Sequence, residues 1–564
     1  MMRKIVLLFA FLLLFIQCKK SEISAEVVRG VVADSAMIVS ARNEASAIGV
    51  SILKKGGNAF DAMIATDLAL AVVYPIAGNI GGGGFTVYRT NDGLTGALDY
   101  REKAPIAAHR DMYLDENGDV VPGKSTLGAF AVGVPGTIAG LFEIHVAFGS
   151  MPFSELIQPS IDLARNGFVV TKRQARALNY YREDFKKANQ RVIHFDSEWN
   201  EGDTLKNPNM ALTLERIRDQ GRDEFYSGET ADMIVKTLNS LGGILTAEDL
   251  KKYEAIWRDP IVFNYKDYKI ISMAPPSSGG VCLEQLLKSI EPYDIGQYAH
   301  NSEKYIQLIT EAERRVYADR AYFLGDPDFV NIPMDTLRSH LYNKNRMDNF
   351  SWDKATPSSV ISHGNIEVVE SNETTHYSIV DTYGNAVAVT NTLNGGYGSK
   401  VYVEEGGFFL NNEMDDLSSK VGSPNMFGLL GAEANSIVPE KRMLSSMTPT
   451  IVEKDGKLKL VVGSPGGATI ITSVLQNIIN VVEYDMGMQE SVSRSRFHHQ
   501  WLPDLIYFEH SFDTVPFPSL RQKGYQIDHE NKGAIGRVDA ILVLPDGSLE
   551  GGADPRGDDS AVGF

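Results

Sequence analysis

The sequence contains only two cysteines among its 564 residues, Cys18 and Cys282. So few thiols exclude a disulfide framework and any metal site that is built from cysteines. Cys282 lies between Val281 and Leu283, and these neighbours predict a small, buried apolar residue.

The sequence also has no excess of positively charged residues. The chain carries 54 lysines and arginines against 72 aspartates and glutamates, a net charge of −18. This balance disfavours a nucleic-acid backbone as a partner. The sequence has neither internal repeats nor low-complexity segments, and its hydrophobic (43%) and charged (22%) fractions are typical of globular proteins. Its length allows several domains or one large layered domain.

The apolar run at the N-terminus is too short to span a membrane. It extends from Ile5 to Ile16 after Arg3 and Lys4. A run of about a dozen apolar residues behind positive charge is typical of an export signal. We therefore expect an exported protein.

The residues before Cys18 resemble a bacterial lipoprotein box, in which the cysteine is lipidated and becomes the first mature residue. Gln17 departs from the small residue usual at that place, so an ordinary signal peptide cut slightly later stays open. We predict an export segment over residues 1–18 and a tether over residues 19–32. We also predict a location in the periplasm or cell envelope, with a lipid anchor at Cys18.

Common cofactor and metal motifs are absent. The glycine-rich stretch from Gly78 to Gly84 lacks the Gly-Lys-Ser/Thr ending of a phosphate loop and precedes a strand, which predicts close approach of two backbones. His498 and His499 lack a His-Glu-x-x-His spacing, so we interpret them as structural. We expect His376 to be a strand residue whose side chain is satisfied locally.

The stretch from Thr374 to Asn394 predicts a β-hairpin. β-branched and aromatic residues fill both arms, and a Gly-Asn turn separates them. Pairing across this turn makes the numbers of facing residues sum to about 766 or 767, which brings Thr392 opposite Thr374 or its neighbour. Taken alone, such a threonine pair indicates no more than good strand residues.

Helical periodicity and capping signals predict several helices. We expect one helix over Ala45–Lys55 and a second that starts at Asn58, which Asp61 helps to cap. Further helices are expected over Thr137–Phe148, Leu212–Gln220, Glu303–Phe323 and Ala468–Val482, the last after a tight turn at Gly463–Gly467. Residues 351–362 are expected to form a surface loop.

The Thr374–Asn394 stretch, together with the later strings LNNEMDD, MLSSM and GSPGG, resembles the γ-glutamyltransferase (γ-glutamyltranspeptidase) family of the N-terminal-nucleophile hydrolases. The resemblance extends from about Ala33 to the C-terminus. It implies an α/β fold, a four-layer αββα sandwich with two stacked antiparallel sheets flanked by helices.

The resemblance also implies a self-processing enzyme. Thr374 would cleave the bond that joins it to Glu373, leaving a large chain (33–373) and a small chain (374–564) of 564 − 373 = 191 residues that build one core together. The new α-amino group of Thr374, with a pKa of about 7.7–8, could then serve as the base for its own hydroxyl. The implied substrate is a γ-glutamyl compound such as glutathione, with water, an amino acid or a dipeptide as acceptor and no cofactor.

The family resemblance assigns a role to each of several residues. Thr392 would orient Thr374, and the N–H groups of Gly466 and Gly467 would stabilise an oxyanion. The glutamyl carboxylate would bind Arg101, Ser445 and Ser446. The glutamyl ammonium would bind Asn394, Glu413 and Asp416.

Plainer interpretations of these residues exist. Arg101 alone would be a surface ion pair, Ser445 and Ser446 a loop cap, and Asp415-Asp416 a solvated turn. A lid over the site would span Val421–Leu430, with Phe427 where several relatives carry tyrosine. A phenyl ring can cover the pocket but cannot make the hydrogen bond of a phenol.

Two other functions remain open at this stage. One is a β-lactam (cephalosporin) acylase of the same superfamily, which would have little use for a complete carboxylate and ammonium clamp. The other is a non-catalytic envelope lipoprotein that binds amino acids or peptides on an uncleaved chain.

Overall fold

The computed structural model describes residues 28–362, 374–530 and 533–564. The predicted export segment, the Cys18 anchor and Glu373 lie outside the described residues. The predicted tether extends too far, because Val31 and Val32 already belong to strand β1 (Val31–Ala33), which pairs with β20 (Leu549–Gly552).

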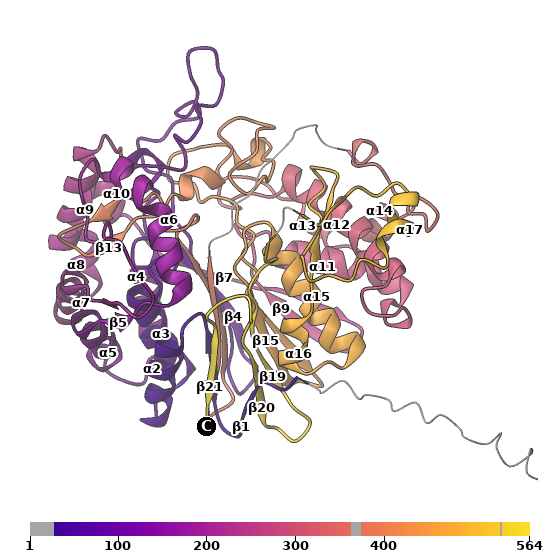
Figure 1. Ribbon diagram of the computed structural model, residues 1–564, viewed down its shortest axis with the longest axis horizontal. Helices are drawn as coiled ribbons and strands as arrows, with labels where there is room; N and C mark the ends of the chain where they lie inside the picture. Colours follow the sequence, from indigo (N-terminus) through magenta and orange to yellow (C-terminus); the bar gives the residue numbers. More distant parts are fainter. Residues whose placement is uncertain (1–27, 363–373, 531–532) are drawn as a thin grey trace, which may run out of the picture.

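Two antiparallel seven-stranded sheets stack against each other in the middle of the molecule (Figure 1). The first sheet has the order β21-β2-β10-β11-β3-β4-β7 and the second β1-β20-β19-β15-β14-β9-β8. The strands not yet given are β2 (Met37–Ser40), β3 (Gly83–Arg89), β4 (Thr95–Tyr100), β7 (Ile256–Arg258), β8 (Ile261–Tyr265), β9 (Tyr268–Ser272), β10 (Thr375–Val380), β11 (Ala386–Thr392), β14 (Thr450–Lys454), β15 (Lys457–Gly463), β19 (Asp539–Val543) and β21 (Ser560–Gly563).

Helices cover the outer face of each sheet, which completes the expected αββα sandwich (Figure 1). The helices on the side of the first sheet are α2 (Asn43–Lys54), α3 (Ala59–Val73), α4 (Thr137–Phe148), α5 (Phe153–Asn166), α6 (Lys172–Asn189), α7 (Pro208–Gln220), α8 (Arg222–Ser227), α9 (Glu229–Ser240) and α10 (Ala247–Lys251). Those on the side of the second are α11 (Gly279–Ile290), α12 (Glu303–Phe323), α13 (Met334–Leu337), α14 (His340–Arg346), α15 (Thr469–Tyr484), α16 (Met488–Ser493) and α17 (Phe517–Gln522).

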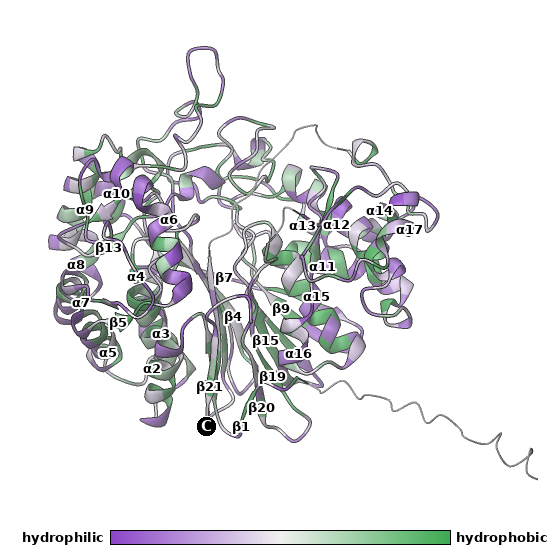
Figure 2. Ribbon diagram, in the orientation of Figure 1, coloured by the Kyte–Doolittle hydropathy of each residue, from purple (hydrophilic) through white to green (hydrophobic). Residues whose placement is uncertain are grey.

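The two-residue period of a strand decides which side chains face each layer. On β10, Tyr377 and Ile379 join the core under the helices, whereas Val380 joins the core between the sheets. Residues 374, 376 and 378 share the face of Val380, so Thr374 is directed between the sheets. Figure 2 shows mostly white and green residues along these strands and more purple along the outer helices.

Most of the local predictions are confirmed. The Asn58 side chain accepts from the backbone N–H groups of Phe60 and Asp61, and the Asp61 carboxylate accepts from the Asn58 N–H. The predicted helices of residues 137–148 and 303–323 have the expected bounds. The predicted surface loop of residues 351–362 is wrong in part, because Thr356, Ser358 and Ile361 are buried against the second sheet's helical layer.

Among the helices of the described residues, none combines the length and the apolar character needed to cross a membrane. Cys282 is fully buried on α11, and burial raises the pKa of its thiol to about 12. It therefore behaves as the apolar core residue that its neighbours in the sequence predict.

Candidate active site

The hairpin of β10 and β11 places Thr374 opposite Thr392. The observed partners Thr375 and Asn391 sum to 766, so the next pair outward is Thr374 and Thr392. Their hydroxyl oxygens lie 3.4 Å apart. The Asn394 N–H donates to the Thr392 hydroxyl at 2.8 Å, which leaves the Thr392 proton available for Thr374.

The glycine-rich stretch holds the end of β11 in place. A Cβ atom on Gly82 would lie 2.1 Å from the carbonyl oxygen of Thr392, so only glycine fits this approach. The same carbonyl accepts from the Asn79 side chain at 2.8 Å. The sequence therefore predicted the use of these glycines correctly, and their effect is to fix the backbone of Thr392.

The turn between β15 and α15 supplies the two predicted N–H donors. Gly466 has φ +137° and Gly467 has φ +53°, backbone conformations that residues other than glycine rarely adopt. Neither N–H group has an acceptor within the part of the chain that the structure describes. Unpaired N–H groups at the start of a helix attract a negative charge.

Arg101 lies fully buried just after β4 and forms ion pairs with two carboxylates that were predicted to bind the substrate ammonium. Its Nη1 lies 2.7 Å from Glu413, and its Nη2 lies 2.6 Å from Asp416. A surface ion pair, the plainer interpretation of Arg101, is thereby excluded. Burial lowers the pKa of this guanidinium, but the surrounding carboxylates raise it by more, so Arg101 stays charged.

The carboxylates outnumber the cation around Arg101. Glu102 and Glu413 are buried and the Asp416 side chain is 10% exposed; burial raises the pKa of each, that of Glu102 to about 8, although Arg101 opposes the shift. Oε2 of Glu413 faces Arg101 at 2.7 Å, whereas its Oε1 has no hydrogen-bond donor among the described residues. Buried acceptors without donors disfavour the empty site and favour a ligand that brings N–H groups and positive charge.

Ser445 and Ser446 line the same cavity, and a second arginine helps to hold them in place. The Arg320 side chain on α12 donates to Ser446 at 2.9 Å and to Ser278 at 2.9 Å, while the Ser278 N–H donates to the Ser445 carbonyl. The sequence analysis missed Arg320. The only signal for it was a run of charged residues on a helix, and charged helical residues are usually solvated.

The predicted lid packs directly on the site. The Phe427 side chain is buried, and a Cβ on Gly467 would come within 2.4 Å of its ring. Asn425 donates to the Asp416 carboxylate at 2.7 Å, and the Met426 N–H donates to Asp415 at 2.8 Å. Asp415 and Asp416 therefore anchor the lid and are not a solvated turn.

A single small cavity of about 20 Å³ joins almost all predicted site residues. The predicted residues that line it are Thr374, Thr392, Gly467, Arg101, Asn394, Glu413, Asp416, Ser445, Ser446 and Phe427. Gly466 instead lines a neighbouring cavity. This small volume holds about one water molecule, so a larger ligand needs the surrounding side chains or the predicted lid to move.

Three histidines near the site are structural, as predicted. His376 bonds with Thr390 (2.9 Å) and Ser378 (3.1 Å), and burial lowers its pKa to about 3. His498 bonds with Gln500, whose amide contacts carbonyls of the lid. His499 is buried beside Asp504, and burial lowers its pKa to about 4.

Comparison with known proteins adds independent information. A family model described as gamma-glutamyltranspeptidase matches residues 45–564. A glutathione hydrolase proenzyme of Escherichia coli (strain K12) is 44% identical over 547 residues, covering 96% of this chain and 94% of that protein.

Solved structures agree with this similarity. The gamma-glutamyltranspeptidase of Helicobacter pylori is 42% identical with a TM-score of 0.56, covering 61% of this chain and 98% of that chain. A cephalosporin acylase from Bacillus halodurans has a TM-score of 0.84 and covers 97% of this chain and 98% of its own. At 24% identity the acylase shows the shared fold alone.

Proposed function

The chain belongs to the γ-glutamyltranspeptidase family, and we propose how its own residues carry out the self-processing and γ-glutamyl transfer of that family. The protein is an enzyme that cleaves γ-glutamyl amides such as glutathione and passes the glutamyl group to water or to an amine. The observation that best supports our assignment of residues is the single cavity that joins Thr374 to Arg101, Glu413 and Asp416.

Processing begins at the bond between Glu373 and Thr374. The Thr374 hydroxyl attacks the Glu373 carbonyl, the acyl group moves from nitrogen to oxygen, and water hydrolyses the ester. The products are the large chain (33–373) and the small chain (374–564). The two chains stay together because β10 and β11 of the small chain pair with β2 and β3 of the large one.

In turnover the free amine of Thr374 takes the proton of its own hydroxyl. The oxygen attacks the γ-carbonyl of the substrate, and the N–H groups of Gly466 and Gly467 stabilise the oxyanion. The amine of the substrate leaves with a proton, and a γ-glutamyl ester of Thr374 remains. Attack by water releases glutamate, whereas attack by an amino acid or dipeptide gives a new γ-glutamyl amide.

The α-carbon of the glutamyl group carries an ammonium and a carboxylate, and the site has both negatively and positively charged side chains to bind them. Its ammonium meets Glu413, whose Oε1 has no donor among the described residues, together with Asp416 and Asn394. Its carboxylate meets Arg101 and the two serines, since a planar guanidinium can donate two parallel hydrogen bonds. This double clamp disfavours a cephalosporin acylase, which would have little use for a complete carboxylate and ammonium clamp.

A direct assay tests the function. Purified protein should release the chromophore from a γ-glutamyl anilide, and addition of glycylglycine should increase the rate and yield a γ-glutamyl dipeptide. An acyl anilide without the α-amino and α-carboxyl groups is the matched control. Turnover of both anilides at equal rates would instead favour the acylase function.

Thr392→Val tests the assignment of the second hydroxyl. The valine keeps the shape of the side chain but can neither donate to Thr374 nor accept from the Asn394 N–H. We expect kcat for the anilide to fall about 10²-fold with a KM within about threefold. Thr392→Ser, which retains the hydroxyl, should lose less than about tenfold; equal losses in both variants would contradict the role.

The enzyme is exported in our proposal, and the lipoprotein box supports a lipid anchor at Cys18. Cys18→Ala should leave soluble protein after osmotic release of the periplasm, whereas the native protein should sediment with membranes and partition into detergent. Equal partitioning of the two proteins would show that the anchor is absent and would leave an ordinary signal peptide.

A further inference from the structure

A second, larger cavity lies on the other side of the Pro465–Gly467 turn. Its volume is about 430 Å³, and Pro465 and Gly466 line it, whereas Gly467 lines the small cavity proposed for the glutamyl group. A carbonyl carbon held at the two glycine N–H groups would therefore have the glutamyl cavity on one side and this larger cavity on the other.

Arg537 connects the larger cavity to the nucleophile. Its Nη2 donates to the carbonyl oxygen of Thr374 at 3.4 Å, and its guanidinium stacks over the ring of Tyr74 at 5.5 Å from the centroid. Both Arg537 and Tyr74 line the larger cavity. A leaving group or an acceptor that reaches Thr374 through the larger cavity therefore passes the positively charged guanidinium of Arg537.

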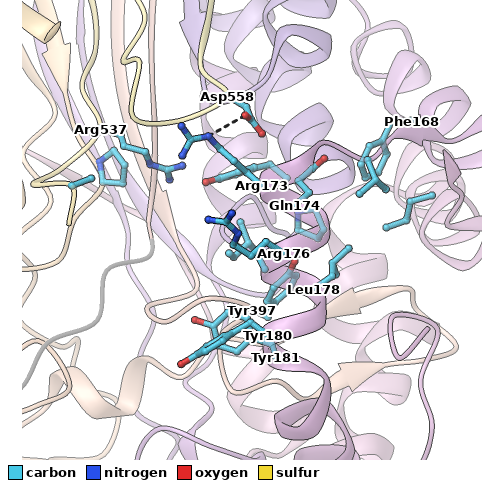
Figure 3. Close-up of a pocket in the computed structure, with 18 of the residues that line it drawn as sticks. Phe168, Arg173, Gln174, Arg176, Leu178, Tyr180, Tyr181, Tyr397, Arg537 and Asp558 are labelled. Atoms are coloured by element: carbon cyan, nitrogen blue, oxygen red, sulfur yellow. Dashed lines mark ion pairs between the residues drawn. The ribbon is translucent and has the colours of Figure 1, made fainter. Parts of the chain in front are cut away.

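Two further arginines enter the cavity from α6. Arg173 and Arg176 are on the exposed side of the helix, and Figure 3 shows their guanidinium groups on the same side of it as Arg537. Asp558 is the only carboxylate among the described lining residues, and it lies 3.4 Å from Arg173. The lining therefore carries an excess of positive charge beside aromatic and apolar side chains.

We propose that this cavity binds the part of the substrate beyond the γ-amide, the departing peptide and then the acceptor, and that Arg173 and Arg176 hold its terminal carboxylate. The inference rests on the proposed function. In the transfer step the acceptor amine attacks the ester carbonyl, the bond to the Thr374 oxygen breaks, and the amine's proton returns to that oxygen. The carboxylate of the acceptor stays bound at the arginines meanwhile.

The volume and the charge define the class of acceptor. About 430 Å³ holds a dipeptide with side chains, and arginines favour carboxylates over neutral ends. Amino acids and short peptides with a free C-terminus should be accepted, and their C-terminal amides should be poor acceptors.

The test compares glycylglycine with glycylglycinamide as acceptors for one γ-glutamyl anilide. The native enzyme should prefer glycylglycine by about tenfold in kcat/KM, and the double variant Arg173→Gln/Arg176→Gln should reduce the preference to about twofold or less. Arg191→Gln, an exposed arginine just beyond α6, is the matched control and should keep the native preference. The rate of anilide cleavage without an acceptor is measured for every protein, and the rate of transfer to each acceptor is divided by this rate.

The outcomes separate this inference from the function on which it rests. If the native enzyme cleaves the anilide without an acceptor but does not distinguish the two acceptors, the inference is overturned and the proposed function stands. The same holds if the double variant keeps the native preference for glycylglycine. If Arg191→Gln also loses the preference for glycylglycine, the preference depends on the net charge of the protein and not on this cavity, and the inference is again overturned. Absence of any anilide cleavage by the native enzyme would reject the proposed function itself.

Discussion

Thr374→Ala is expected to leave the chain in one piece and to reduce anilide cleavage by a factor of about 10⁴ or more. Alanine has no hydroxyl to attack the Glu373 carbonyl, so the bond stays intact. Without that cleavage the chain also lacks the free amine that serves as base. The denatured intact mass of the native protein should show two chains, the smaller of 191 residues from Thr374 to Phe564 (564 − 373 = 191).

Thr374→Ser is the matched control for this experiment. It retains a hydroxyl at the same place, 3.4 Å from Thr392 in the native structure, and should therefore still be cleaved, though more slowly. A native protein that is folded yet remains uncut would contradict the mechanism proposed above. Such a result would favour the uncleaved binding protein that the sequence also allowed.

The local structure of the site could be predicted from the sequence because its signals are local. The register of the hairpin follows from one short turn, and the observed sum of 766 places Thr374 opposite Thr392 as expected. The glycines near Gly82 were predicted to let two backbones approach closely, and the tight turn at Gly463–Gly467 was predicted from its glycines and proline, whereas the role of Gly466 and Gly467 as donors came from the family resemblance. Each of these inferences needs only a few neighbouring residues.

The contacts between distant residues could not be predicted from periodicity. Arg101 and Asp416 are 315 positions apart, and Arg320 and Ser446 are 126 positions apart. Their meeting depends on how the two sheets stack, which no local pattern encodes. The family resemblance supplied Arg101 and Asp416, but not Arg320 or Arg537, whose neighbours in the sequence gave no comparable signal.

The resemblance assigned the positive and the negative residues of the clamp to different groups of the substrate, whereas the structure pairs these residues with each other. Arg101 was assigned to the substrate carboxylate, and Glu413 and Asp416 to the ammonium. In the small cavity these groups form ion pairs with each other, at 2.7 Å for Arg101 and Glu413 and at 2.6 Å for Arg101 and Asp416. A glutamyl group that enters must replace part of each pair by its own charges, so binding exchanges one set of buried ion pairs for another.

Arg101→Gln is expected to damage both stability and binding. The variant leaves Glu102, Glu413 and Asp416 buried with no cation between them, and breaking a buried ion pair from one side costs about 3–5 kcal/mol. We expect kcat/KM for the anilide to fall about 10²- to 10³-fold, mainly through KM. Arg101→Lys keeps the charge but not the planar fork, so it should recover more of the stability than of the binding.

The pH dependence of unfolding distinguishes this explanation from general misfolding. Burial already raises the pKa of these three carboxyl groups, and removal of Arg101 should raise it further. A carboxyl group with a higher pKa in the folded state binds more protons there than in the unfolded state, so stability falls as pH rises. The urea midpoint of Arg101→Gln should therefore drop between pH 5 and pH 8 more steeply than that of the native enzyme. A parallel dependence in both proteins would mean that Arg101 does not lower the pKa of these carboxyl groups.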